Sequence, residues 1–194
     1  MLIHDCTQCS RLHLHLKELK KKFPSYHCKP VTGSGKLSSM ICIIGLAPGL
    51  HGANKTGVPF TNDFSGVLLR EVLHEINLNN CFITNAVRCF PKNNKPLAIE
   101  KNNCQKFTQK ELNKLKKLRV IVTLGEVAYK QIIKVYGLSG SAYKFKHGNI
   151  VKLNDQLSLI SSYHCSKLNI NTGKFNRDML KNIFLKAMKI VNYE

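Results

Sequence analysis

Acidic residues are scarce in this sequence of 194 residues. It has 11 Asp and Glu against 30 Lys and Arg, which gives a formal net charge of +19. The excess is spread along the chain instead of being gathered in a tail, and it indicates a polyanionic partner such as nucleic acid. Such binding would be strong, blind to sequence and weakened by salt. A genome rich in A and T also enriches Lys and Asn, so the charge by itself leaves both explanations open.

A long apolar run is missing as well. Residues 1–20 contain no apolar segment or cleavage site of a secretory signal. The apolar stretch from Ile41 to Leu50 is interrupted by Pro48 and Gly49, so it is unable to cross a bilayer. We therefore expect a protein of the cytoplasm that has no contact with membranes. In a reducing compartment, its eight cysteines are more typical of metal binding than of disulfides.

The usual nucleotide-binding motifs are also lacking. There is no GxGxxG, and the sequence TGSGKL at residues 32–37 lacks the leading Gly and the final Ser or Thr of a phosphate-binding loop. These absences argue against an NTPase and against a dinucleotide-dependent dehydrogenase.

Apolar runs alternate with stretches of helical spacing, within a length that fits one domain. The predicted strands are Met40–Leu46, Cys81–Val87, Val120–Leu124 and Leu157–Ser161, with a hairpin partner for the last of them at Asn149–Leu153. Helices are predicted over residues 17–22, 65–76, 107–118, 128–136 and 175–191. This alternation predicts an α/β fold, a three-layer αβα sandwich around a mostly parallel sheet of four strands.

Polar side chains follow three of these strands, where a parallel sheet places its ligands. Asp63 ends a long loop after the first strand, Asn85 lies at the end of the second, and His164 follows the fourth. Each also has a structural explanation. Asp63 would cap the helix that follows it, Asn85 would tie down a turn, and His164 would be a hydrogen-bonded structural side chain.

Four cysteines form a candidate metal site. Cys6 and Cys9 are spaced as CxxC, and Cys89 and Cys104 lie far downstream, which together supply the four thiolates of a [4Fe-4S] cluster or a structural zinc. A local zinc site is the alternative, with the ligands Cys6, Cys9, His27 and Cys28. Spacing alone leaves both open. Two further cysteines, Cys42 and Cys81, lie inside predicted strands and are expected in the core.

Four linked motifs between Cys6 and about Gly173 resemble those of the family 5, or type b, uracil-DNA glycosylases. They are GLAPGLHGANKTG, PFTND, TNAVRC followed by NKP, and SYHCSKLNINTG. The resemblance implies a DNA-repair enzyme that flips uracil, and other deaminated or damaged bases, out of DNA and hydrolyses the glycosidic bond to leave an abasic site. It also implies a structural [4Fe-4S] cluster on Cys6, Cys9, Cys89 and Cys104.

The resemblance assigns further roles to individual residues. Asp63 would position or activate water, Asn85 would face the base, and His164 would bind the base carbonyl as negative charge accumulates on it. The implied base-binding residues are Gly45, Ala47, Phe60, Asn85 and His164, with Phe60 stacking on the base. The implied DNA-binding residues are His51, Asn54, Lys55, Ser166, Lys167 and Asn169.

Three positions depart from the patterns of the relatives. Ala47 stands where the wider superfamily often has a water-activating Asp, a loss that family 5 shares. Asn62 stands where Gly is expected, and Cys165 stands where Pro usually follows the His. We expect the loss of that Pro to loosen the loop from Ser166 to Gly173, which in relatives enters the minor groove and fills the gap left by the base.

We therefore expect one domain over residues 1–194, acting as a monomer on double-stranded DNA in a bacterial or archaeal cytoplasm. Residues 1–35 would form a cluster-binding segment packed on it. Two alternatives are a family 4 glycosylase and a metal-stabilised module that binds DNA without chemistry.

Overall fold

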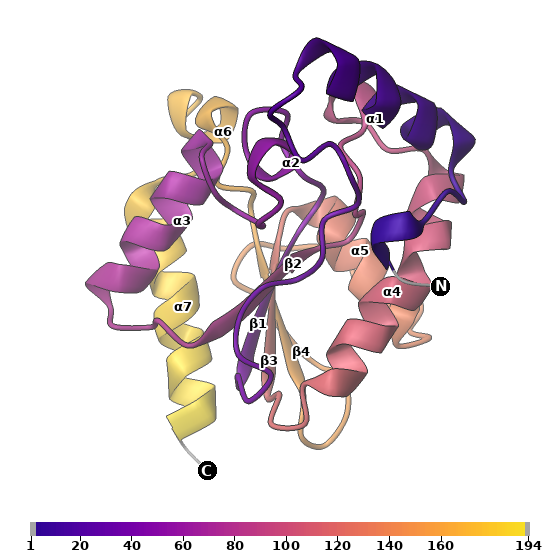
Figure 1. Ribbon diagram of the computed structural model, residues 1–194. Coiled ribbons are helices and arrows are strands. Elements are labelled where there is room, and N and C mark those ends of the chain that lie inside the picture. The colour runs from indigo at the N-terminus through magenta and orange to yellow at the C-terminus, as the bar shows by residue number, and fades with distance from the viewer. Residues whose placement is uncertain (1–2, 193–194) are drawn as a thin grey trace.

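A single sheet of five strands forms the centre of the structure, a computed structural model that describes residues 3–192 (Figure 1). The strands are β1 (Ile41–Gly45), β2 (Cys81–Asn85), β3 (Val120–Leu124), β4 (Ile150–Lys152) and β5 (Ser158–Ser162). Their order is β2-β1-β3-β5-β4, and all neighbouring pairs are parallel except β4 with β5. The predicted α/β class is confirmed. The prediction of four strands is wrong, because the expected hairpin partner, β4, joins the sheet as an edge strand.

Four helices cover the two faces of the sheet. They are α3 (Phe64–Glu75) and α7 (Arg177–Asn192) on one face, and α4 (Ala98–Lys114) and α5 (Glu126–Val135) on the other (Figure 1). Successive residues of a strand point to opposite faces. Thus Ile41 and Ile43 pack with α3 and α7, whereas Cys42 and Ile44 pack with α4 and α5. Both faces are apolar because both are buried, which gives the three predicted layers.

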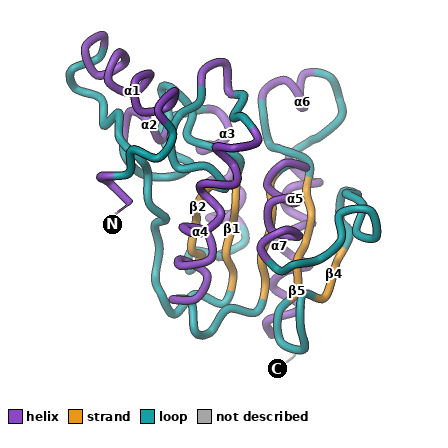
Figure 2. Tube along the Cα trace, turned by 90° about the vertical axis from the view of Figure 1, so that its right-hand side faces the viewer, coloured by secondary structure: helices purple, strands orange, loops and turns teal. Residues whose placement is uncertain are grey.

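The remaining helices lie beyond the carboxyl ends of the strands. They are α1 (Ser10–Lys22), the short α2 (Ala53–Thr56) and α6 (Lys167–Asn171), and Figure 2 shows all three at that end of the sheet. Two 3-10 turns, Ile3–Asp5 and Lys92–Asn94, complete the described elements.

Helix α1 begins at Ser10, earlier than the predicted helix over residues 17–22, because Leu12, Leu16 and Leu19 are buried at helical spacing. No helix within residues 3–192 is long and apolar enough to cross a membrane. The first two and last two residues of the predicted domain lie outside the described residues.

Candidate active site

A cavity of about 530 Å³ opens at the carboxyl ends of the strands. The loop after β1, the end of β2 and the loop after β5 all contribute to it, and its walls include Ala47, Phe60, Asp63, Asn85 and His164. The register places Gly45, the last residue of β1, directly beside Asn85 on β2. The three polar residues expected to share a site therefore do share one cavity.

Asp63 uses its two carboxylate oxygens differently. It is the N-cap of α3, and its Oδ1 accepts a hydrogen bond of 2.8 Å from the Gly66 N–H. Its Oδ2 lies against Gly49 and Gly52, since a Cβ at Gly49 would lie 2.6 Å from this oxygen and one at Gly52 closer still. No hydrogen bond to Oδ2 is found among the described residues. The carboxylate thus caps the helix and keeps one oxygen for a ligand.

The unexpected Asn62 fits its position. Its φ of +60° lies in the left-handed region, where Asn is tolerated better than any residue except Gly. Its amide nitrogen also donates a hydrogen bond of 2.8 Å to the His51 carbonyl across the loop. The substitution therefore adds a tie between the two ends of the loop that presents Asp63.

Glycine at position 45 makes room for two side chains of the cavity. A Cβ there would lie 2.5 Å from Cζ of Phe60 and 2.7 Å from Oδ1 of Asn85. The backbone of Phe60 has a φ of +51° and is held by Arg70, whose Nε donates a hydrogen bond of 2.7 Å to the Phe60 carbonyl. Phe60 both packs in the core and lines the cavity, so its place in the core is compatible with the predicted stacking on a base.

Asn85 is buried, with 3% of its surface exposed. No hydrogen bond of its side-chain amide is found among the described residues, and the amide faces the cavity. A buried amide without protein partners has both donor and acceptor capacity available for a ligand.

His164 lies on the loop after β5. Burial lowers the pKa of its imidazole, and the negative charge of Asp63 opposes that shift without cancelling it. The ring is therefore neutral near pH 7 and able to donate one hydrogen bond into the cavity. The loop is fixed locally, because the Asn169 amide nitrogen donates a hydrogen bond of 2.8 Å to the His164 carbonyl.

Comparison with known proteins identifies the family. The sequence model of the uracil DNA glycosylase superfamily matches residues 32–188. The chain belongs to that superfamily. It is 36% identical to the type-5 uracil-DNA glycosylase of Thermus thermophilus, over 95% of this chain and 93% of that protein. It is 33% identical to the type-5 enzyme of Pyrobaculum aerophilum, over 94% of this chain and 88% of that protein. It is also 33% identical to the type-5 enzyme of Mycobacterium bovis, over 100% of this chain and 81% of that protein.

Cys165, which stands where proline is usual in this superfamily, is fully buried in the core. Its thiol donates a hydrogen bond of 3.7 Å to the carbonyl of Ser65, in the first turn of α3. Burial raises the pKa of Cys165 to about 12, so the thiol stays protonated and remains a donor. Cys165 thus joins the His164 loop to the helix that Asp63 caps, and the expected loosening of residues 166–173 stays a prediction.

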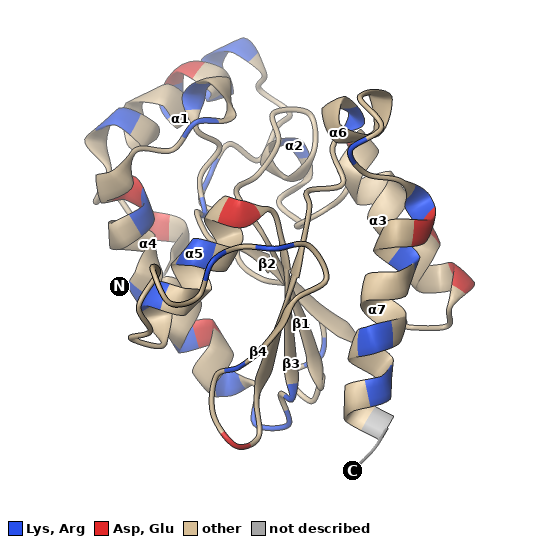
Figure 3. Ribbon diagram, turned by 180° about the vertical axis from the view of Figure 1, so that it is seen from behind, with Lys and Arg blue, Asp and Glu red and all other residues tan. Residues whose placement is uncertain are grey.

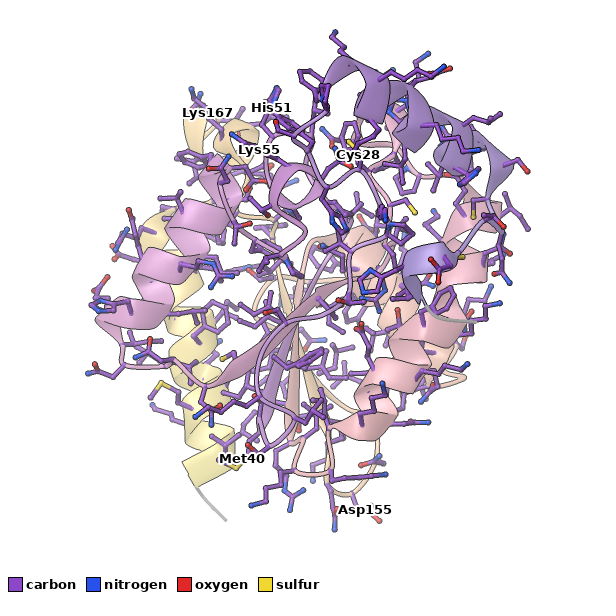
Figure 4. The ribbon with its side chains drawn as sticks, viewed as in Figure 1. Cys28, Met40, His51, Lys55, Asp155 and Lys167 are labelled. Carbon is purple, nitrogen blue, oxygen red and sulfur yellow. The ribbon has the colours of Figure 1, made fainter. Side chains whose placement is uncertain are left out.

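Several of the residues expected to bind DNA lie around the mouth of the cavity. His51, Lys55 and Lys167 are exposed, and Figure 4 shows them close together at the end that carries α2 and α6. Ser166 caps α6 by accepting a hydrogen bond of 3.3 Å from the Asn169 N–H. Ser166 and Asn169 are partly exposed, so contact with DNA stays a prediction for both.

The prediction that Asn54 contacts DNA is wrong. Its side chain has no exposed surface, and its amide nitrogen donates to the sulfur of Cys28 at 3.5 Å. Asn54 therefore joins α2 to the segment that follows α1, beneath the surface of this glycosylase fold.

The sequence analysis singled out neither Asn94 nor Leu168. Asn94 lines the cavity, but it stands in an irregular loop with a φ of +56° that no periodicity predicts. Leu168, on α6, has 72% of its surface exposed. Apart from the partly buried Ile170, it is the large apolar residue between Ser166 and Gly173, and this was the available signal.

The four candidate cluster ligands are brought together in a separate pocket. Cys6, Cys9, Cys89 and Cys104 all line it, together with apolar side chains such as Phe107. Cys42 and Cys81 are buried in the sheet instead, as predicted.

The surroundings of these four cysteines fit a cluster. The lining of the pocket includes the apolar side chains of Leu12 and Phe107, and the amide nitrogen of Asn103 donates a hydrogen bond of 3.4 Å to the Cys9 sulfur. Within residues 3–192, no three His, Cys, Asp or Glu side chains are close enough to hold one metal ion. This holds for the four cysteines and for the alternative zinc set alike, but His27 and Cys28 are not among the described residues that line this pocket, so the pocket brings together the four-cysteine set.

Proposed function

We propose that this chain is a type-5 uracil-DNA glycosylase, which takes uracil out of DNA and hydrolyses the bond between the base and its sugar. The convergence of Asp63, Asn85 and His164 on one cavity carries the proposal. Its volume of about 530 Å³ lies within the range of small-molecule sites. A base in a duplex reaches such a cavity only when its nucleotide leaves the stack, at a cost of about a few kcal/mol.

The three side chains suit the charges that develop as the bond breaks. The sugar becomes cationic and the departing base anionic, so catalysis consists mainly of stabilising those charges. His164 and Asn85 would donate hydrogen bonds to the base, and the free Oδ2 of Asp63 would favour the sugar cation and orient water. No lysine is found among the described residues that line the cavity. This supports simple hydrolysis to an abasic site, without attack by an amine on the sugar.

The alternatives have less support. Type-4 enzymes are more distant relatives, the Pyrobaculum aerophilum protein being 28% identical over 84% of this chain. The type-4 loop typically offers an acid where this chain has Gly52, Ala53 and Asn54. A module that only binds DNA does not require a carboxylate, an amide and an imidazole that face one cavity and are available to a ligand.

Excision from a labelled duplex tests the function. The purified protein is incubated with a duplex that carries one uracil, and abasic sites are then cleaved with alkali. We expect cleavage at the uracil and none in the matched thymine duplex. A hypoxanthine duplex reports whether the wider substrate range of the type-5 relatives extends to this chain. Uracil cleavage no greater than that of the thymine control would refute the proposed function.

Double-stranded DNA is the proposed partner. Lys and Arg are spread over α1, α6 and α7 with few acidic residues between them (Figure 3), and such a surface neutralises phosphates. Leu168, on α6, is exposed and lies two residues beyond Ser166, which lines the cavity. Exposed apolar residues of this kind commonly enter a base step that has been opened.

Leu168→Ala is therefore expected to slow excision from a U:A pair about tenfold and to affect a single-stranded substrate much less, since only the duplex must be opened. Single-turnover rates on the two substrates measure this. The control is Ile99→Ala, which shortens a side chain with 60% exposure on α4, away from the cavity. Equal slowing on both substrates would argue against the insertion of Leu168 into an opened base step.

We also propose that Cys6, Cys9, Cys89 and Cys104 hold a structural [4Fe-4S] cluster. The shared pocket of the four thiols, the apolar side chains beside them and the Asn103 hydrogen bond support it. The cluster would tie the segment before α1 to the loop after β2 and to α4, and so shape the DNA-binding face. None of the eight cysteines forms a disulfide in the described residues, which is consistent with the proposed reducing cytoplasm.

Iron and sulfide analysis checks the cluster. The wild-type protein, purified without oxygen, is expected to contain about four iron atoms per chain. Cys104→Ser should lose most of the iron together with the visible absorbance of the thiolate-iron bonds. Cys81→Ser is the control, because this cysteine is buried in β2 and outside the pocket. Equal iron in both variants would contradict the assignment of Cys104.

A further inference from the structure

His147 contacts the residue that immediately precedes His164. Its imidazole stacks on the Tyr163 ring, with centroids 5.0 Å apart and an angle of 8° between the planes. Its Nδ1 also accepts a hydrogen bond of 3.1 Å from the backbone N–H of Tyr163. One side chain thus holds both the ring and the backbone of Tyr163, from a loop that is sixteen positions earlier in the sequence.

The other groups around Tyr163 leave it little freedom. Lys174 places its ammonium 4.9 Å from the centre of the Tyr163 ring, and Phe145 lies 5.8 Å from it. The ring of Phe175 meets His147 edge-on at 5.8 Å. The stack is therefore part of a packed aromatic cluster, and a rotation of Tyr163 would disturb several contacts at once.

The loop is also held on both sides of Tyr163. The Gly125 N–H donates a hydrogen bond of 2.8 Å to the Ser162 carbonyl, and the His164 carbonyl accepts one of 2.8 Å from Asn169. The contact with His147 is a tie at the residue between these two. At the same residue, Oγ of Ser162 donates a hydrogen bond of 2.9 Å to the Tyr163 carbonyl, so His147 secures the N–H side of Tyr163.

The hydrogen bond requires one protonation state of His147. Its Nδ1 accepts only when it carries no proton, so the ring is neutral with its proton on Nε2. Burial lowers the pKa of His147, and the nearby ammonium of Lys186 lowers it further. Lys186 of α7 is thus the charged group that disfavours a protonated ring, while Lys189 lines the same hollow as His147 and Lys174 lies over the Tyr163 ring.

We propose that neutral His147 is a positioning residue for uracil excision, which orients His164 through the backbone of Tyr163. This rests on the proposed function of the cavity. A misplaced donor is expected to lower the excision rate far more than the affinity for DNA. The reason is that catalysis depends on groups that are oriented in advance towards the developing charge. His147 lines a different hollow, between the β4 side of the sheet and α7, and would not touch the base.

Two substitutions separate the acceptor from the stack. His147→Asn keeps an acceptor oxygen close to the position of Nδ1 but removes the ring, and His147→Phe keeps a ring but removes the acceptor. Under single-turnover conditions with saturating uracil duplex, we expect His147→Phe to excise about tenfold more slowly. His147→Asn should remain within about threefold of the wild type, and both should bind DNA normally. Normal excision by His147→Phe, or equal loss in both variants, would overturn the proposal.

A double-mutant cycle tests whether the effect passes through His164. In a His164→Ala background, His147→Phe should cost no further rate, because the group that it positions is already gone. Losses that multiply would mean that His147 acts by general destabilisation. Unfolding temperatures measured for all four proteins confirm that the compared proteins are folded.

Nitrogen-15 spectra of the histidine rings give a readout that does not depend on activity. We expect His147 in its Nε2–H form at pH 7, and we expect the His164 ring signals to shift in His147→Phe but not in His147→Asn. A proton on Nδ1 of His147 would overturn the proposal even if excision is found. If the wild-type protein did not excise uracil, the proposed function of the cavity would be refuted. The spectra would then still show whether His147 accepts the hydrogen bond from Tyr163.

Discussion

Asp63→Asn is expected to bind a uracil duplex as well as the wild type and to excise the base at least about a hundredfold more slowly. The amide keeps an oxygen that accepts from the Gly66 N–H, the bond that now caps α3 at 2.8 Å. It is neutral, however, so it neither stabilises a cationic sugar nor takes a proton from water. The substitution thus removes the chemistry of the free oxygen and leaves the cap in place.

Single-turnover excision and DNA affinity, measured side by side, check this expectation. The matched control is Asp155→Asn, an exposed acid that Figure 4 shows at the opposite end of the molecule from His51 and Lys167. It should excise at the wild-type rate. If Asp63→Asn also did so, the carboxylate would be only a helix cap, and another group would have to manage the water.

The sequence predicted the centre of the sheet well because burial on both faces makes a strand a continuous apolar run. The predicted strand at Val120–Leu124 agrees with β3 at both ends, and Met40–Leu46 contains β1. The edge strand β4 has a different pattern. Only Val151 of its three residues is buried, so its place in the sheet depends on pairing with β5, a tertiary contact.

The candidate site was predictable where it follows from topology. Parallel strands bring their carboxyl ends to one edge, so Asp63, Asn85 and His164 were expected to converge before any coordinates were known. Asn54 shows the limit of this reasoning. It reads as an exposed loop residue, but its partner Cys28 is 26 positions away. No local pattern carries that contact.

Cys165 shows how the structure changes the meaning of a substitution. Read from the sequence, the loss of proline frees the backbone of a loop that is required to meet DNA. In the fold, the cysteine side chain fills the core and donates to Ser65, 100 positions earlier. A proline would restrict φ at this position, whereas the cysteine adds a packing contact between the loop and α3.

His164→Ala is expected to bind DNA but to excise uracil about a hundredfold more slowly, the usual cost of losing one donor aimed at a developing anion. His164→Gln keeps an amide N–H and should recover part of the loss. His74→Ala is the control, because His74 is exposed on α3 and does not line the cavity. Single-turnover excision at a saturating duplex concentration measures all three, and a wild-type rate in His164→Ala would leave the anion without its proposed donor.

The same substitution should change how stability depends on pH. Because the pKa of His164 is lower in the folded protein than the ordinary 6.5, the unfolded chain binds the extra proton more readily. The wild type therefore loses stability as pH falls below about 6.5, until the folded pKa is passed as well. His164→Ala lacks this loss, so its unfolding temperature should fall less between pH 7 and pH 5. The same measurement on His74→Ala shows how much the loss of an exposed histidine changes this fall. Parallel curves for His164→Ala and the wild type would mean that His164 is solvated like a surface histidine, and a solvated imidazole would be too weak a donor for the role proposed here.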